Sequence, residues 1–533
     1  ATTGEFNTSL GSLSMGSGVT TGDQNVAIGY ATGVSIAAGA FNVLVGNSAG
    51  TAITTGTENV AIGHQALSTE NAHGKNVAVG HTALLTLDAG ADAFNVAVGN
   101  SAGKLMTTGI RNTLVGSLAG DALTSGSYNT ALGNGALSSE DAHGKNVAIG
   151  YQALVAQNAG SDAYNVAVGF EAGHDLIQGL QNTLVGGFAG CKITSAQYNT
   201  SLGYQSLASN LIGDNNTALG YLALQDFVAD TDGHGNNTAV GASAMMNAST
   251  GTENTALGNL AMAGGVTTGN SNVALGHGTG YNISSGQDNT LVGTGTGDSI
   301  TSGARNTAVG FAALATENAH GNNTAIGYAA LNTLDADAEG YNVAIGSNSG
   351  KLMTSGVNNS LLGYNSGTAM TTGTENTLIG SLAGDAITTG VRNTVVGYAA
   401  LSQEDAHGTN VAIGYAALSV QNAGADAFNT AVGYSSGIAV TTGAYNTLIG
   451  GLAGDALTTG EMNVAVGYGS LGSEDGNGKC VAIGMSALTT QNAGAEAYNV
   501  AVGYNAGYAV TTGVQNTLIG GLAGDALTTG ADN

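Results

Sequence analysis

The hydrophobic positions of this chain recur in a short, fixed pattern. A pentad, Asn-(Val/Thr)-x-(Val/Ile/Leu)-Gly, occurs thirty times between Asn7 and Gly520, with Ser360 once at its second position and Cys480 once at its first. Of the 29 intervals between successive pentads, 21 are 17 residues long and the others are 18, 19 or 21. Self-similarity at a fixed period indicates a repeat architecture in which each repeat forms one structural unit.

Each pentad has the two-residue alternation of a β-strand. In residues 146–150, Val147 and Ile149 point to one side and Ala148 to the other. We therefore expect positions two and four to form the one buried face of the strand. The closing glycine permits a turn with positive φ. A second segment, typified by residues 122–126, is expected to form a short return strand.

The composition supports stacked strands. The 533 residues include 89 Gly and no Pro, and Pro is excluded from strand ladders because it lacks an N–H. The sequence thus predicts an all-β fold, a parallel β-solenoid (β-roll) of about 30 coils of ~17 residues. Stacking would align the pentad asparagines in a column, where their amides can form a hydrogen-bonded ladder.

A longer rhythm of four coils, 70 residues in all, lies over the short one. Coils of 19 residues begin at five positions, several of them 70 residues apart: Asn76, Asn146, Asn323, Asn410 and Cys480. The order is irregular over residues 216–289, which include the one 21-residue coil. We expect residues 1–533 to be a single continuous array. Because Asn533 would begin a further pentad, we also expect the array to be a fragment of a longer chain.

Position three carries a large apolar residue in one coil type: Leu114, Leu184, Leu291, Leu378, Leu448 and Leu518. If positions two and four are buried, these leucines form an apolar stripe on the opposite face, which implies a partner surface. A side-by-side homo-oligomer is the favoured interpretation. The alternative is that both faces meet interior space within one chain.

Charge excludes two classes of partner. The chain has 35 acidic and 9 basic residues, a net charge of −26, and so lacks the basic stripe that a nucleic-acid binder needs. An anionic membrane surface would repel it. No run of 18 apolar residues suggests membrane insertion in this segment.

Histidines recur with acidic residues at one turn: Glu70 and His73, Glu140 and His143, Glu317 and His320, Glu404 and His407. These turns lie about four coils apart, roughly 19 Å at the usual strand spacing, so one chain cannot pool them around an ion. The matching turn at Glu474 has no His. We expect solvated corners and no metal-ligating residues, with sites on an oligomer axis as the open alternative.

Other candidate sites are sparse. Asp121, Asp385, Asp455 and Asp525 suggest calcium, but they recur only every fourth coil, whereas calcium β-rolls place ligands on successive turns. Thr107 with Thr108, and Thr458 with Thr459, suggest ice binding, although adjacent residues face opposite ways. Cys191 and Cys480 are too far apart to pair. No nucleophile elbow, P-loop or zinc motif occurs, so we predict no enzyme, no catalytic residues and no cofactor.

With the pentad established, a family likeness can be named. Asn-Val-Ala-Ile-Gly at residues 25–29, 146–150 and 410–414 resembles the Asn-Ser-Val-Ala-Ile-Gly repeat of trimeric autotransporter adhesin heads. Asn-Thr-Ala-Ile-Gly-Tyr-Ala-Ala-Leu at residues 323–331 is similar to repeats in phage tail-fibre-like proteins and in giant surface proteins of Bacteroidota-type bacteria. The resemblance implies left-handed β-rolls that trimerise. The period of 17 exceeds that of the adhesin heads, so larger rings stay open.

Taken with the resemblance, these patterns favour a structural or adhesive segment of an extracellular fibre, on a cell-surface appendage or a virion tail. Its expected partners are copies of itself and the surface or glycans of a host or prey cell. One alternative is a tailspike-like fibre that binds or depolymerises carbohydrate. Another is a calcium- or ice-binding solenoid.

Overall fold

The computed structural model describes residues 3–16, 19–231 and 234–533 and is a parallel β-solenoid of about 30 turns of ~17 residues. This confirms the predicted all-β solenoid. Each turn contributes one three-residue strand, and the described residues contain no helix. Accordingly, no helix in the described ranges is long and apolar enough to cross a membrane.

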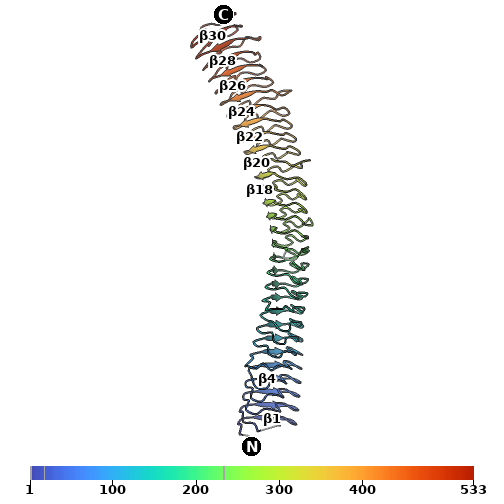
Figure 1. The fold of residues 1–533 in the computed structure, drawn as a ribbon. Helices are drawn as coiled ribbons and strands as arrows, with labels where there is room; N and C mark the ends of the chain where they lie inside the picture. Colours follow the sequence, from blue (N-terminus) through green and yellow to red (C-terminus); the bar gives the residue numbers. More distant parts are fainter. Residues whose placement is uncertain (1–2, 17–18, 232–233) are drawn as a thin grey trace. The chain divides into compact units, whose positions relative to one another are not determined.

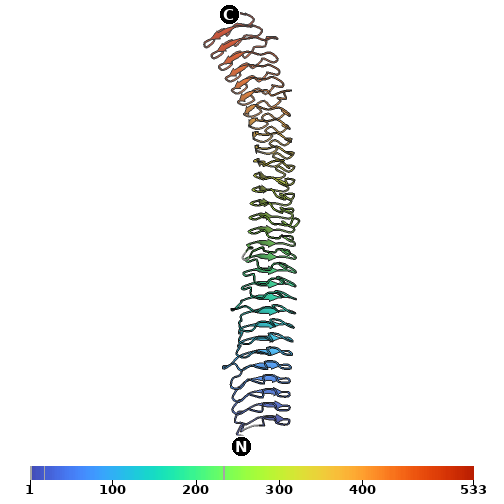
Figure 2. The same ribbon diagram turned by 45° about the vertical axis from the view of Figure 1, so that its right-hand side comes forward.

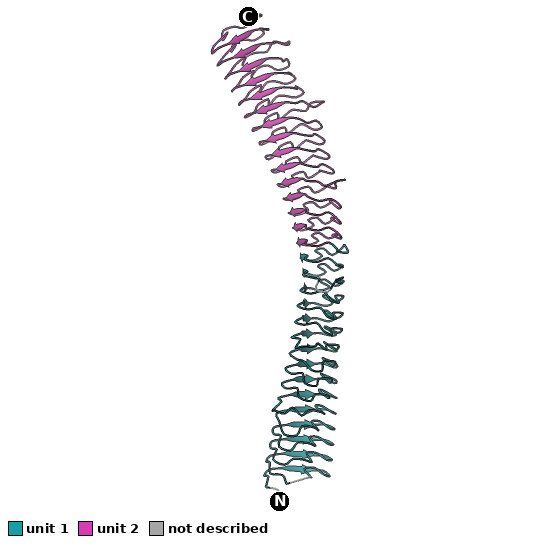
Figure 3. Ribbon diagram, in the orientation of Figure 1, with its two compact units in different colours: residues 1–268 teal, residues 269–533 magenta. Residues whose placement is uncertain are grey.

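The chain divides into two compact units, Ala1–Thr268 and Gly269–Asn533 (Figures 1 and 3). The strands of the first unit are β1 (Thr8–Leu10), β2 (Val26–Ile28), β3 (Val43–Val45), β4 (Val60–Ile62), β5 (Val77–Val79), β6 (Val96–Val98), β7 (Thr113–Val115), β8 (Thr130–Leu132), β9 (Val147–Ile149), β10 (Val166–Val168), β11 (Thr183–Val185), β12 (Thr200–Leu202), β13 (Thr217–Leu219), β14 (Thr238–Val240) and β15 (Thr255–Leu257). Those of the second unit are β16 (Val273–Leu275), β17 (Thr290–Val292), β18 (Thr307–Val309), β19 (Thr324–Ile326), β20 (Val343–Ile345), β21 (Ser360–Leu362), β22 (Thr377–Ile379), β23 (Thr394–Val396), β24 (Val411–Ile413), β25 (Thr430–Val432), β26 (Thr447–Ile449), β27 (Val464–Val466), β28 (Val481–Ile483), β29 (Val500–Val502) and β30 (Thr517–Ile519).

Within each unit the strands stack on one another (Figure 2). They pair in parallel, without any shift in register. For example, Val147, Ala148 and Ile149 of β9 lie opposite Val166, Ala167 and Val168 of β10. Equivalent pentad positions therefore form columns that run along each unit.

The central residue of the strand, not its two neighbours, faces the core. In β9, Ala148 is fully buried, whereas Val147 and Ile149 are half-buried. The other strands share this pattern, with positions two and four half-buried or exposed; only in β1, the first strand, is the central residue exposed too. The prediction that positions two and four form the buried face is therefore wrong.

The asparagine ladder explains which face is inside. Asn165 is fully buried; its Nδ2 donates to the carbonyl oxygen of Gly179 at 2.8 Å, and its Oδ1 accepts the backbone N–H of Asn182 at 2.8 Å. The amide thus satisfies a carbonyl oxygen of its own coil and an N–H of the next coil, which would otherwise be buried without partners. Side-chain amides of successive coils also bond to one another, as where Nδ2 of Asn182 donates to Oδ1 of Asn165 at 3.3 Å, which confirms the predicted ladder at these coils. At Asn146 the ladder is interrupted, because Nδ2 has no hydrogen-bond partner among the described residues. Because positions one and three share a face of the strand, burying the asparagine also buries position three.

The leucines at position three consequently lie in the core rather than on a partner-facing stripe. Leu114, Leu184, Leu291, Leu378 and Leu448 have no exposed surface, and Leu518 in the last strand is 8% exposed. Glycines make room for them. A Cβ added at Gly103 would lie 2.8 Å from side-chain atoms of both Leu84 and Leu114. The expectation that these six leucines mark an interface is therefore wrong.

The return segment also differs from the prediction. Residues 122–126 form turns and bends instead of a strand, although Leu123 is fully buried. The backbone N–H groups of Thr124 and Ser125 both donate to one carbonyl oxygen, that of Asp141, at 2.5 and 3.2 Å. Two donors on one acceptor cannot continue a regular ladder, in which each carbonyl serves its own strand partner.

Candidate functional site

Positions two and four of the pentad form a broad outward face on the strands. Position two is Val or Thr, once Ser, and position four is always Val, Ile or Leu, so neither column contains a charged residue. Several position-four side chains are well exposed, including Leu132 at 46% and Leu202 at 50%. Position four is thus an apolar column beside an uncharged column of Val and Thr, on a chain of net charge −26, and extended apolar patches mark interaction sites. We refer to positions two and four of the strands as the sheet face.

A column of aromatic rings follows the pentad glycine. Tyr398 and Tyr415 stack with ring centroids 5.5 Å apart, and Tyr415 and Tyr434 at 5.3 Å. In the first unit Tyr151 and Phe170 stack at 5.1 Å. The three tyrosines of the second unit are 50–60% exposed. This column was not among the residues predicted to be functional, although the fixed place of the rings directly after the glycine is a signal visible in the sequence.

The acidic-histidine turns are not solvated corners. The twelfth residue of a coil, counted from the pentad asparagine, points into the core, where Ile53 and Leu123 are fully buried. At five turns this residue is a glutamate with no exposed surface: Glu70, Glu140, Glu317, Glu404 and Glu474. The prediction of solvated turns is wrong for these five residues, because coil stacking places the twelfth residue inside.

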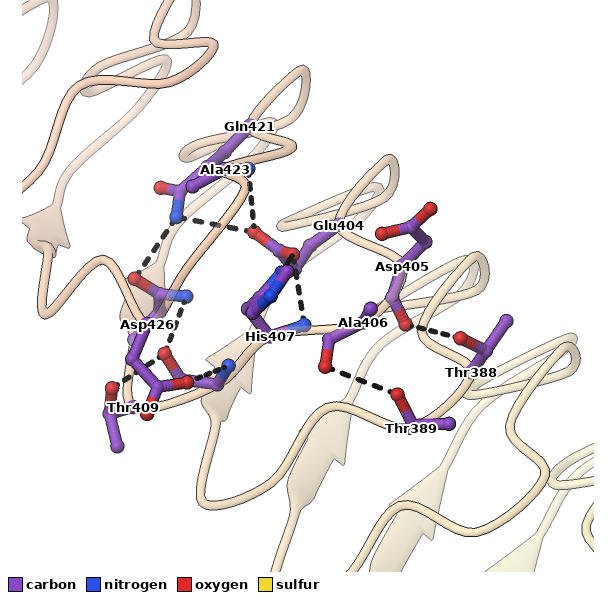
Figure 4. Close-up of polar contacts among 12 residues, drawn as sticks. Thr388, Thr389, Glu404, Asp405, Ala406, His407, Thr409, Gln421, Ala423 and Asp426 are labelled. Carbon is purple, nitrogen blue, oxygen red and sulfur yellow. Dashed lines mark hydrogen bonds and ion pairs between the residues drawn. The ribbon is translucent and has the colours of Figure 1, made fainter.

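Hydrogen bonds from backbone N–H groups hold each buried carboxylate, as Figure 4 shows for Glu404. Oε1 of Glu404 accepts the N–H of His407 at 3.2 Å, and Oε2 accepts the N–H of Ala423 in the next coil at 3.4 Å. The side chain of Gln421 also donates to Oε2, at 3.4 Å. Burial nevertheless raises the pKa of all five carboxyls, and that of Glu140 reaches about 7.

The imidazole of the same turn lies against the glutamate. Nδ1 of His143 is 3.9 Å from Oε1 of Glu140, and the distance from His407 to Glu404 is the same. Nδ1 of each of these histidines is buried and accepts or donates no hydrogen bond. The recurrence in the sequence grouped these residues correctly, and the prediction drawn from it was that one chain cannot pool different turns around an ion. The structure instead gathers possible ligand atoms within single turns or neighbouring coils.

The remaining candidates do not converge. Oδ1 of Asp121 and of Asp385 is buried without a hydrogen-bond partner, yet neither residue belongs to a group of three possible ligand atoms among the described residues. Thr107 donates its hydroxyl to the carbonyl oxygen of Thr124 in the next coil at 3.2 Å. This hydroxyl therefore stabilises the contact between neighbouring coils.

Both cysteines are free thiols, as their separation in the repeat predicted. Cys480 is fully buried in the asparagine column, and burial raises the pKa of its thiol to about 11. A thiol of this kind is a poor nucleophile.

Comparison with known proteins adds no identity to these features. No protein-family description matches the chain, and no curated protein matches it either.

Proposed function

We propose that this chain is a structural and adhesive segment of an extracellular fibre, and that copies of it associate side by side through the sheet face. The observation that carries the proposal is the lack of any charged residue at positions two and four of thirty strands. If the 35 acidic residues of the chain were placed at random, some of them would fall at positions two and four. Side-chain charge would be costly there only if the columns became buried.

A second copy of the chain suits this face because the rows of side chains on its strands have the same spacing. When the sheet faces of two copies meet, their side chains can therefore interdigitate along the whole length of the contact. Complete burial of an aliphatic side chain is worth about 1.5–3 kcal/mol, so a half-exposed one gains roughly 1 kcal/mol. The fifteen position-four residues that one unit of each copy contributes would together gain roughly 15 kcal/mol per copy, which already reaches the upper end of the association cost of about 4–15 kcal/mol.

The test compares charge on the sheet face with equal charge elsewhere. We expect the double variant Leu132→Lys and Leu202→Lys to shift the oligomer toward monomer in native mass spectrometry and light scattering. The matched control, Thr55→Lys with Thr108→Lys, places the same charge at exposed corners and should leave the oligomer intact. A wild-type chain that is a folded monomer at micromolar concentration would refute the proposal.

We propose that attachment to cells or glycans uses the exposed aromatic column. Tyrosine combines an apolar ring with a polar hydroxyl, a combination suited to surfaces that are part wet and part apolar. Repetition along a fibre converts weak single contacts into avid binding. Replacing Tyr398, Tyr415 and Tyr434 by Ser should reduce binding to a glycan array without altering the oligomer. Release of shortened saccharides by the wild-type chain would instead favour the depolymerising alternative.

A further inference from the structure

Three of the acidic-histidine turns each bring together three side chains able to bind a metal. The ligand atoms of each group lie within 4.8 Å of one another, and the groups are Glu70 with His73 and Asp88, Glu140 with Asp141 and His143, and Glu404 with Asp405 and His407. Carboxylate oxygen and imidazole nitrogen together are the donor set of zinc and related divalent transition ions. Each group lies within one turn or two neighbouring coils, so no partner chain is needed to complete it.

Unpaired buried atoms within the groups favour a bound cation. Nδ1 of His143 is buried and has no hydrogen-bond partner, and the same is true of Oε2 of Glu140. The Glu140 side chain has no exposed surface at all. Nδ1 of His73 and of His407 is likewise buried and unpartnered. Buried polar atoms without partners are rare and costly in native proteins, and a cation accepting their lone pairs would remove that cost.

The charge of the turn also lacks a fixed counter-ion. Among the described residues, the lysine and arginine ion pairs involve Asp92, Asp162, Glu375 and Glu496, and none reaches the glutamates of the three groups. Buried carboxylates are normally paired or coordinate metals. A proton could also neutralise the buried carboxylate, so the experiment must distinguish metal binding from protonation.

The distances require only a small contraction. Zinc binds nitrogen and oxygen at about 2.0–2.2 Å, so its ligands lie at most roughly 4 Å apart. The Nδ1 atom of His143 and Oε1 of Glu140 are 3.9 Å apart already. Asp141 is exposed and can close the remaining gap by a change of rotamer. The backbone N–H of His143 donates to Oε1 of Glu140 at 3.1 Å and keeps the turn in place.

We propose that these three turns are zinc-class metal sites, each formed by one Glu, one Asp and one His of a single chain, with water completing the coordination. The Glu474 turn is a natural negative control, because it has Asn477 where His143 stands. The Glu317 turn has the same residue types as the Glu70 group: Asn318 matches Asn71, and Asp335 in the next coil matches Asp88. Neither turn gathers three ligand atoms within the same distance in the described part of the chain.

The binding test uses the whole chain without a histidine tag, after treatment with a chelator. Titration with Zn²⁺, followed by calorimetry and metal analysis, should give three ions per chain, one for each group. Co²⁺ should give the visible absorption bands of a protein-bound ion. His143→Gln should remove one ion, and His73→Gln, His143→Gln and His407→Gln together should remove all three. No binding at about 1 mM metal, or unchanged stoichiometry in the triple variant, would overturn the proposal.

Variants that add a site control for the possibility that the loss-of-site variants bind less metal only because they misfold. Asn318→Asp and Asn477→His each supply the missing ligand at an accessible turn position, so each should add one ion per chain. His64→Gln is the matched control, since His64 stacks on His81 at 5.1 Å outside the three groups, and its stoichiometry should equal that of the wild type. If both added ligands leave the stoichiometry unchanged while the chain stays folded, the assigned geometry is wrong.

Discussion

The asparagine ladder offers a quantitative test of what stabilises this fold. Asn446 is almost fully buried; its Oδ1 accepts the backbone N–H of Asn463 at 3.0 Å, and its Nδ2 donates to the carbonyl oxygen of Gly460 at 2.8 Å. The Asn446→Ala variant leaves that N–H and that carbonyl buried without partners. Each such group costs about 1–3 kcal/mol, so we expect a local destabilisation of roughly 2–6 kcal/mol.

One coil provides the reciprocal experiment, because Cys480 stands where the other coils have asparagine. In the equivalent 19-residue coil, Oδ1 of Asn146 accepts the backbone N–H of Asn165 at 3.1 Å. Cys480→Asn would offer the same acceptor to the N–H of Asn499. The Asn499 N–H now faces the weak sulfur acceptor of Cys480, and a buried hydrogen bond to an amide oxygen is worth about 0.5–1.5 kcal/mol net, so this change should stabilise the second unit.

Hydrogen exchange is the suitable assay, because long repeat arrays do not unfold in two states and a single melting temperature is not a defined free energy. Hydrogen exchange of the backbone N–H of Asn463 should accelerate at least tenfold in the Asn446→Ala variant, which corresponds to about 1.4 kcal/mol. Exchange of the Asn499 amide should slow in Cys480→Asn. An Asn446→Ala chain whose Asn463 amide keeps wild-type protection would refute the view that the ladder fixes the inner face.

Three further predictions address the core and the turns. In the presence of a chelator, the chain should be more stable at pH 5 than at pH 8. A carboxyl whose pKa is raised on folding stabilises the fold most below its unfolded pKa and loses that contribution as pH rises through the folded pKa. For Glu140, whose pKa rises from 4.5 to about 7, the loss is about 3 kcal/mol. Glu140→Gln should flatten the pH profile of stability, measured by hydrogen exchange of the backbone N–H groups around Glu140. Leu114→Ala should destabilise the first unit by about 2–5 kcal/mol without changing the oligomer, because Leu114 is fully buried; dissociation in native mass spectrometry would contradict its inward placement. Gly150→Ala should disrupt its coil, since φ is +137° and the new Cβ would lie 2.1 Å from the carbonyl oxygen of Gly169; circular dichroism and limited proteolysis near residue 150 would detect the change, and an undisturbed chain would contradict the tight contact.

Most of the architecture could be predicted because it follows from the repeat itself. The 17-residue spacing, the absence of proline and the invariant glycine together predicted stacked parallel strands, and a residue such as Asn165 could be assigned to a ladder from its recurrence alone. The turn at Glu140 and His143 could also be identified as a candidate site from recurrence. The burial of Glu140 could not be predicted, because the twelfth residue of a coil points inward only once the turn has folded back over the strand.

The sequence by itself determined the coil length, the strand position and the columns, since these depend on spacing along the chain. It could not decide which side of each strand is inside. Alternation distinguishes Ala148 from Val147 and Ile149 but favours burial of the larger pair, whereas the structure buries Ala148. The reason is tertiary: the asparagine at position one must reach a carbonyl oxygen at the far end of its own coil and an N–H of the next coil, and position three shares its face. Satisfying buried backbone groups outweighed burying the larger apolar side chains, and it left those side chains on the surface.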